Sequence, residues 1–78
     1  MKSYLKASDI RKLFGCNPST AYEYIDYVMN TINKSGERYV DSDEYKHRCL
    51  PYKRELKEVP TKLFVEFYPS TKEQVKGL

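Results

Sequence analysis

The chain has 78 residues, with 14 Lys and Arg against 11 Asp and Glu, and a formal net charge of +3. A single domain is expected at this length, with a thin core, because so short a chain buries only about 60% of its unfolded surface. No apolar run approaches the roughly 20 residues that a membrane span needs, and the N-terminus lacks the apolar core of a signal peptide, so neither a membrane protein nor a secreted one is expected.

A short helix is predicted from Ala7 to Phe14, after an extended lead-in at Tyr4 and Leu5. Its apolar residues recur at spacings of three and four, which places them on one face. Asp9 puts a negative charge in the first turn, where it favours the helix N-terminus. Gly15 ends the helix, because glycine tolerates the left-handed conformation found at many helix ends.

A longer helix is predicted from Pro18 to about Lys34. Asn17 is a good N-cap, and Pro18 occupies the first helical position, where no donor is needed. Lys34 places a favourable charge in the last turn, and Gly36 stops the helix. The apolar stripe of this helix consists of Ala21, Tyr24, Ile25, Val28 and Ile32. Tyr22 is expected to be exposed.

The middle of the chain is predicted to be less regular. Tyr39 and Val40 form either a short strand or a helix extension, and the residues from Asp41 to Glu44 form a solvated loop. A β-hairpin follows, with arms at about His47–Leu50 and Leu56–Val59. A proline in its turn region fits an edge or turn position.

A final helix is predicted over Lys62 to Tyr68, opened by Pro60 and Thr61. Pro69 ends this helix, because proline cannot donate and disfavours helix in the residue before it. The polar segment from Ser70 to Leu78 is predicted to be frayed.

The segment from Ala7 to Ile25 has the pattern of a helix-turn-helix. That motif needs a bracing helix, a tight turn with a glycine, and a second helix for the major groove. The turn is the one at Gly15. The positions that would pack the two helices together are Ile10, Phe14, Cys16, Ala21 and Tyr24 or Ile25.

These residues carry a resemblance to a known group. The chain resembles the small winged helix-turn-helix proteins of phages and integrative elements in Gram-positive bacteria, a group of excisionases and small DNA-binding regulators. The likeness rests on Tyr4–Ile10 leading to Leu13–Gly15, on Ser19–Tyr22, and on Val59–Phe64. It implies an α+β, mainly α fold: a winged helix-turn-helix with a short β-hairpin and a closing C-terminal helix over residues 1–69, followed by a flexible tail over 70–78.

Three positions depart from the group's pattern. Lys6 stands where a capping Thr or Ser is common, so Ser8 is expected to cap the helix instead. Arg11 replaces a small residue that faces the second helix, so its side chain must extend outward or alter the helix crossing. The stretch from Asp41 to Arg54 is longer than the usual wing, which leaves the register of the hairpin open.

The function implied by the resemblance is sequence-specific binding of double-stranded DNA, as a small transcriptional regulator or excisionase. Hydroxyl and carboxylate groups can read base edges, whereas cations contact phosphates and position the protein. The expected base contacts are Asn17, Ser19, Thr20, Tyr22 and Glu23. The expected phosphate or minor-groove contacts are Lys12, Lys46, Arg48, Lys53, Arg54 and Lys57. Further partners are a second copy of the chain, as a dimer or a cooperative array on DNA, and an integrase or host protein.

Two acids weigh against this prediction and favour an alternative. Glu23 and Asp26 lie on the face expected to meet DNA, where Arg11 or Lys12 would have to neutralise them. The alternative is a phage-borne protein-interaction module that inhibits a host enzyme, with the acids facing a basic partner. An enzyme is not expected, since no nucleophile–base pair, phosphate loop or carboxylate pair stands out.

The two cysteines indicate a reducing compartment. Cys16 and Cys49 occur without a secretory signal, which predicts a reduced, cytoplasmic protein. Together with the single His47 they have no ligand spacing, so neither a metal site nor another cofactor is expected.

Overall fold

The computed structural model describes residues 2–48 and 57–78. It is an α+β fold, mainly helical, with one two-stranded antiparallel sheet in these residues, which confirms the predicted class in this coarser form. The elements in chain order are β1 (Tyr4–Leu5), α1 (Ala7–Phe14), α2 (Pro18–Asn30), the 3₁₀ turn η1 (Tyr39–Asp41), α3 (Asp43–Arg48), β2 (Val59–Pro60), α4 (Thr61–Phe67), the 3₁₀ turn η3 (Pro69–Thr71) and α5 (Lys72–Lys76).

Helix α1 has the predicted bounds, and its N-terminus is held by a carboxylate. Asp9 accepts a hydrogen bond from the backbone N–H of Lys6 at 2.9 Å and another from Lys2 Nζ at 2.7 Å. Lys6 is the N-cap residue, so the expectation that Ser8 caps the helix is wrong. The reason is that the Asp9 side chain reaches back to the free N–H of Lys6, as the acid of a capping box does.

The turn between α1 and α2 forms as predicted. Gly15 has φ of 63° and donates its N–H to the carbonyl of Arg11 at 2.7 Å, which closes α1. Asn17 caps α2, since its side-chain oxygen accepts from the N–H of Thr20 at 2.8 Å. Both signals act within a few residues of each other, so local chemistry alone fixes this connection.

Helix α2 ends at Asn30, four residues before the predicted end at Lys34. The Thr31 hydroxyl donates to the carbonyl of Tyr27 at 2.6 Å, which satisfies an acceptor of the last turn. Ile32, predicted to belong to the apolar stripe, is 66% exposed. Gly36 has φ of 81° and belongs to a separate turn that starts at Asn33.

The two strands are more than 50 residues apart in the sequence. Tyr4 is paired with Pro60 and Leu5 with Val59. The predicted hairpin between 47–50 and 56–59 is therefore wrong where the structure describes it: β2 pairs with β1, and residues 47 and 48 lie in α3. The remainder of the first arm and the start of the second lie outside the described residues.

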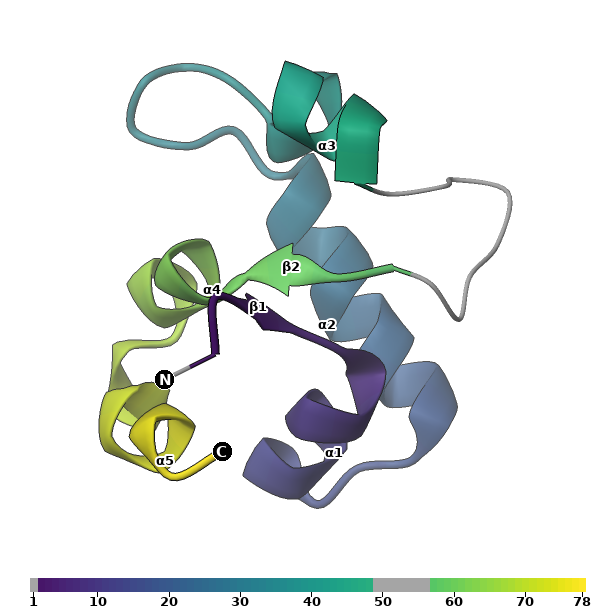
Figure 1. The fold of residues 1–78 in the computed structure, drawn as a ribbon, viewed down its shortest axis with the longest axis vertical. Helices are drawn as coiled ribbons and strands as arrows, with labels where there is room; N and C mark the ends of the chain where they lie inside the picture. The colour runs from purple at the N-terminus through teal and green to yellow at the C-terminus, as the bar shows by residue number, and fades with distance from the viewer. Residues whose placement is uncertain (1, 49–56) are drawn as a thin grey trace.

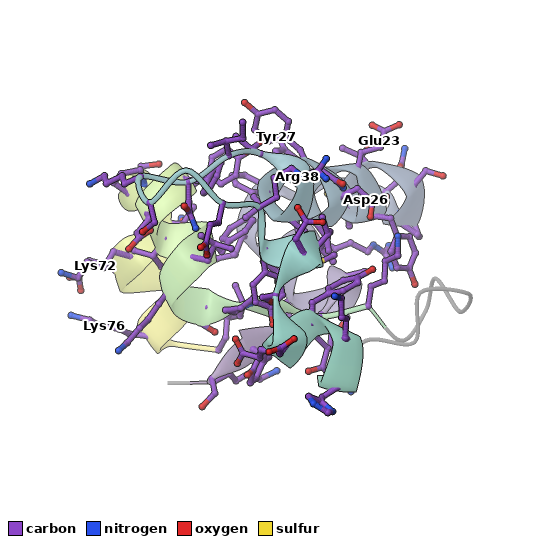
Figure 2. All side chains as sticks on the ribbon, turned by 90° about the horizontal axis from the view of Figure 1, so that it is seen from above. Glu23, Asp26, Tyr27, Arg38, Lys72 and Lys76 are labelled. Atoms are coloured by element: carbon purple, nitrogen blue, oxygen red, sulfur yellow. The ribbon has the colours of Figure 1, made fainter. Side chains whose placement is uncertain are left out.

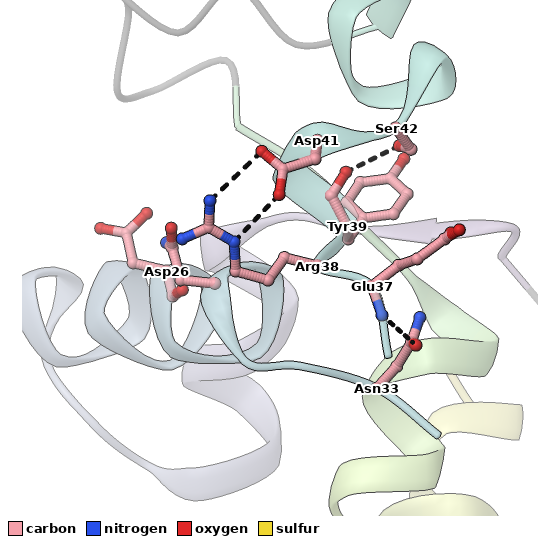
Figure 3. A network of polar contacts seen from close by, with 8 residues as sticks. Asp26, Asn33, Glu37, Arg38, Tyr39, Asp41 and Ser42 are labelled. Carbon is pink, nitrogen blue, oxygen red and sulfur yellow. Dashed lines mark hydrogen bonds and ion pairs between the residues drawn. The ribbon is translucent and has the colours of Figure 1, made fainter. Parts of the chain in front are cut away.

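Helix α3 replaces the predicted loop at Asp43 and Glu44 and the start of the first hairpin arm. Ser42 explains this helix, because its hydroxyl oxygen accepts from the N–H of Tyr45 at 3.1 Å as an N-cap does. The same hydroxyl donates to the carbonyl of Tyr39 at 2.7 Å in η1, as Figure 3 shows. Tyr39 and Val40 thus form neither a strand nor an extension of α2.

The C-terminal segment is ordered, contrary to the predicted frayed tail. Helix α4 starts and ends within one residue of its prediction, and η3 and α5 then bring the chain back to the core. Val75 is fully buried and Thr71 is 2% exposed. The prediction failed because two apolar side chains, Val75 and Leu78, in a polar tail give too little periodicity to detect.

One core joins all these elements. Figure 1 shows α1 and α2 meeting at one side, α4 and α5 at the other, and the sheet between them, with α3 beyond the C-terminal end of α2. The fully or almost fully buried apolar side chains are Leu5, Ile10, Ala21, Ile25, Val28, Met29, Val59, Phe64 and Val75.

Candidate interface on helix α2

Helix α2 presents one buried face and one exposed face. Ala21, Ile25 and Val28 are fully buried against the core. The opposite face carries Ser19 and Glu23, both exposed. The core therefore fixes which side of the helix is available to a partner.

The predicted base-contact residues divide into exposed and engaged side chains. Ser19 and Glu23 are exposed, and Thr20 is half-buried. The side-chain oxygen of Asn17 is engaged by the N–H of Thr20. Tyr22, expected to be exposed, is partly buried and packs against the core, because it lies at the edge of the buried stripe.

The predicted cations are brought together only in part. Lys12 is exposed on α1, close to the turn. Lys57 donates from Nζ to Asp26 at 2.8 Å, so it lies directly against α2. Lys46 and Arg48 belong to α3, at the other end of α2 from its N-terminus (Figure 1). Lys53 and Arg54 lie outside the described residues.

The acids of α2 are balanced differently from the prediction. Lys57 neutralises Asp26, whereas Arg11 donates from Nε to the carbonyl of Cys16 at 3.3 Å. Of the two alternatives expected for Arg11, the structure has the first: its side chain extends outward and contacts the backbone of the turn. Glu23 forms no ion pair within residues 2–48 and 57–78. The expectation that Arg11 or Lys12 neutralises these acids is wrong. The cation that pairs with Asp26 is Lys57, which is distant in sequence and could not be assigned to it from the sequence.

An aromatic groove of about 490 Å³ lies between α2 and α4. Figure 2 shows Glu23 and Tyr27 projecting outward from the same side of α2. Sequence reasoning missed the contribution of α4, although Thr20, Glu23, Tyr24 and Tyr27 have the spacing of one helix face. The lining residues are Thr20, Glu23, Tyr24, Tyr27, Phe67 and Tyr68.

Two ionisable groups have shifted pKa values. Burial, with Tyr24 and Tyr27 nearby, raises the pKa of Tyr68 and keeps its phenol neutral in the groove. Burial alone would raise the pKa of Asp9. The hydrogen bonds from Lys2 and Lys6, with the positive charges of Lys2 and Lys12, outweigh burial and lower it.

Comparisons with known proteins add no family to this geometry. No family model, curated protein or solved structure matches the chain. Among the helices of residues 2–48 and 57–78, none is long and apolar enough to cross a membrane. The same residues hold no group of three or more His, Cys, Asp or Glu side chains placed to bind a metal ion.

Proposed function

We propose that this chain binds double-stranded DNA through α2, as the second helix of a helix-turn-helix formed with α1. The observation that carries the proposal is the turn at Gly15 and Asn17. It joins the two helices tightly and leaves the first turn of α2 exposed, as a helix that enters a major groove requires. The role proposed is that of a small regulator or excisionase.

The charges around α2 determine how such a complex is held. Helix α2 contains no Lys or Arg, so its phosphate contacts have to come from flanking elements. Lys12 on α1 is exposed beside the turn, and Lys57 reaches α2 from the segment before β2. Each phosphate that these cations neutralise should contribute about −0.9 to the slope of log K against log salt.

Base reading falls to the short polar side chains of the first turns of α2. Ser19 and Thr20 can donate or accept hydrogen bonds at base edges, and Glu23 can accept from a cytosine amino group. The hydroxyl of Ser19 is exposed, so it can reach a base without a change in the helix.

Selection from a random duplex pool tests the proposal without a known target. We expect enrichment of one sequence at low salt. The double variant Ser19→Ala, Thr20→Ala should bind it about 5- to 150-fold more weakly, since base contacts contribute about 1–3 kcal/mol, and should bind random duplex almost unchanged.

Two further variants complete the experiment. Lys12→Ala should weaken binding to every sequence and reduce the salt slope by about 1. Ser70→Ala, an exposed serine in η3, is the matched control and should change neither quantity. Failure to retain any duplex at low salt would refute the proposal.

A further inference from the structure

The groove between α2 and α4 places four aromatic rings beside Thr20 and Glu23, two of the proposed base-reading residues. Four of its six lining residues are aromatic, one is a carboxylate and one a hydroxyl, and no cation lines it. Its volume of about 490 Å³ lies within the range of about 300–1,000 Å³ typical of small-ligand sites. The groove can therefore take a side chain with its stem.

The aromatic rings of the groove form two nearly perpendicular pairs. Tyr27 and Phe67 have ring centroids 6.2 Å apart at 84°, and Tyr24 and Tyr68 have centroids 5.6 Å apart at 81°. In an edge-to-face pair, the edge of one ring covers only one face of the other ring, so the opposite face of that ring is not covered by its partner. A ring face carries negative electrostatic potential and attracts a cation placed over it.

Rings behind the groove hold two of its walls in place. Phe14 stacks on Tyr24 with centroids 4.5 Å apart at 18°, and it meets Tyr68 edge-on at 5.7 Å. Tyr68 also packs on the fully buried Phe64 at 5.0 Å. Tyr27, in contrast, is 59% exposed. A ligand thus meets a wall fixed by packing on one side and the exposed ring of Tyr27 on the other.

The charge of the groove selects a positive ligand. Glu23 is its one ionised group, and the described residues supply it with no ion pair. Two cations near α2 are paired with acids other than Glu23. Lys57 bonds Asp26, and Arg38 bonds Asp41 at 3.0 Å (Figure 3). Lys72 and Lys76 project from α5 on another side of the molecule (Figure 2).

We propose that this groove binds an arginine side chain of a partner polypeptide. A guanidinium stacks on aromatic faces and donates two parallel hydrogen bonds to a carboxylate, and Tyr27 and Glu23 lie one helical turn apart on α2. A lysine ammonium offers no plane to stack and is more strongly hydrated. A phosphate is disfavoured by Glu23, so the groove favours a cation, although Thr20 and Glu23 also belong to the proposed base-reading face.

A titration with blocked tripeptides tests the proposal on the full chain. The probe is leucyl-arginyl-leucine amide, acetylated at its N-terminus, and its counterpart carries neutral citrulline in place of arginine. Binding is followed by amide chemical shifts in NMR spectra. We expect shifts centred on Glu23 and Tyr27 and at least tenfold weaker binding of the citrulline peptide. Equal binding of the two peptides would overturn the proposal, as would binding of free arginine amide as tight as that of the peptide.

Three variants assign the binding to the groove. Glu23→Gln and Tyr27→Leu should each weaken the arginine peptide at least fivefold. Both side chains are exposed, so neither change disturbs the core. Glu66→Gln on α4 is the matched control, since Glu66 is exposed but lies outside the groove, and it should bind as the parent does. Unchanged affinity in the first two variants would contradict the proposal.

The same variants keep this proposal separate from the DNA-binding one. Loss of the Glu23 charge should weaken the peptide, whereas it should leave binding to random duplex equal or stronger, because a negative charge near phosphates is removed. A chain that binds duplex but not the peptide refutes the groove proposal alone. A chain that binds the peptide but not duplex refutes the DNA proposal alone.

Discussion

Replacing Asp9 by Asn probes how the N-terminal segment is attached to the fold. Asp9 is 2% exposed, and its carboxylate accepts hydrogen bonds from both Lys2 Nζ and the N–H of Lys6. Each acceptor oxygen is used by a different donor. Asparagine offers one oxygen and one NH₂ group, so one of the two donors loses its acceptor and faces another donor instead.

The size of the effect follows from these two bonds. Leaving one buried donor without its acceptor costs about 1–3 kcal/mol. In a domain of about this size, 1 kcal/mol lowers Tm by about 4–8 °C, so Asp9→Asn should lower Tm by at least about 4 °C. Lys2 is 48% exposed at its side chain, so solvent screens its charge, and the lower end of this range applies if the amide oxygen keeps the Lys6 N–H.

The pH dependence of the Asp9 effect has a defined sign. The pKa of Asp9 is lower in the folded state than its ordinary value of 3.8. Its carboxylate therefore contributes stability that is present above the unfolded-state pKa and is lost as pH falls through the lower folded-state pKa. The gap in stability between the parent and Asp9→Asn should be largest at neutral pH and should narrow below about pH 4.

Urea unfolding of both proteins from pH 7 to pH 3, followed by circular dichroism, measures this gap. Glu73→Gln is the control, because it breaks an exposed ion pair in which Glu73 is 83% exposed and Lys76 lies at 3.4 Å. Such pairs contribute about 0–1 kcal/mol. The proposed role of Asp9 would be refuted if Asp9→Asn lowers the free energy of unfolding no more than Glu73→Gln does, or if its effect is independent of pH.

Two further substitutions test the C-terminal helix and the turn. Val75→Ala should destabilise the protein by about 2 kcal/mol, since two buried methyl groups are lost. An unchanged Tm in a thermal melt would instead support the frayed tail predicted from the sequence. Gly15→Ala should destabilise the protein by about 1–2 kcal/mol in the same urea assay. Backbone strain at φ of 63° is the whole cause, because nothing lies within 4 Å of an added Cβ. The control Gly77→Ala, with φ of −87°, should cost less than half as much.

Features determined by neighbouring residues were predictable from the sequence. The end of α1 at Gly15, the cap at Asn17 and the start of α4 near Pro60 each depend on one or two side chains and on the backbone beside them. Such signals act over a single turn, so they can be read without knowing the rest of the fold.

Features that depend on distant contacts were not predictable. A strand ending at Val59 was predicted, but nothing in the sequence showed that its partner is Leu5, more than 50 residues earlier in the chain. The cap formed by Ser42 was visible in principle, but a nearby cluster of charged residues favoured a loop. The burial of Val75 depends on its packing against core residues from distant parts of the chain, which only the assembled fold provides.

The candidate site shows the same division. Its α2 residues could be placed on one helix face from their spacing, which led to Ser19 and Glu23. Phe67 and Tyr68 could not be placed, because α4 meets α2 only in the folded chain. The partner of Asp26 was likewise assigned to α1 and is Lys57 instead.

Glu23 takes part in both proposals for α2. It lies between the exposed Ser19 and the aromatic groove, and no described cation offsets its charge. A bare carboxylate beside DNA lowers affinity for every sequence in which no cytosine amino group meets it. An arginine bound in the groove would neutralise that charge. By thermodynamic linkage, a partner that supplies the arginine without blocking α2 would then strengthen duplex binding, and duplex would strengthen the partner's binding by the same factor. A partner that covers Ser19 as well would instead compete with DNA, so measuring duplex affinity with and without saturating peptide distinguishes the two arrangements.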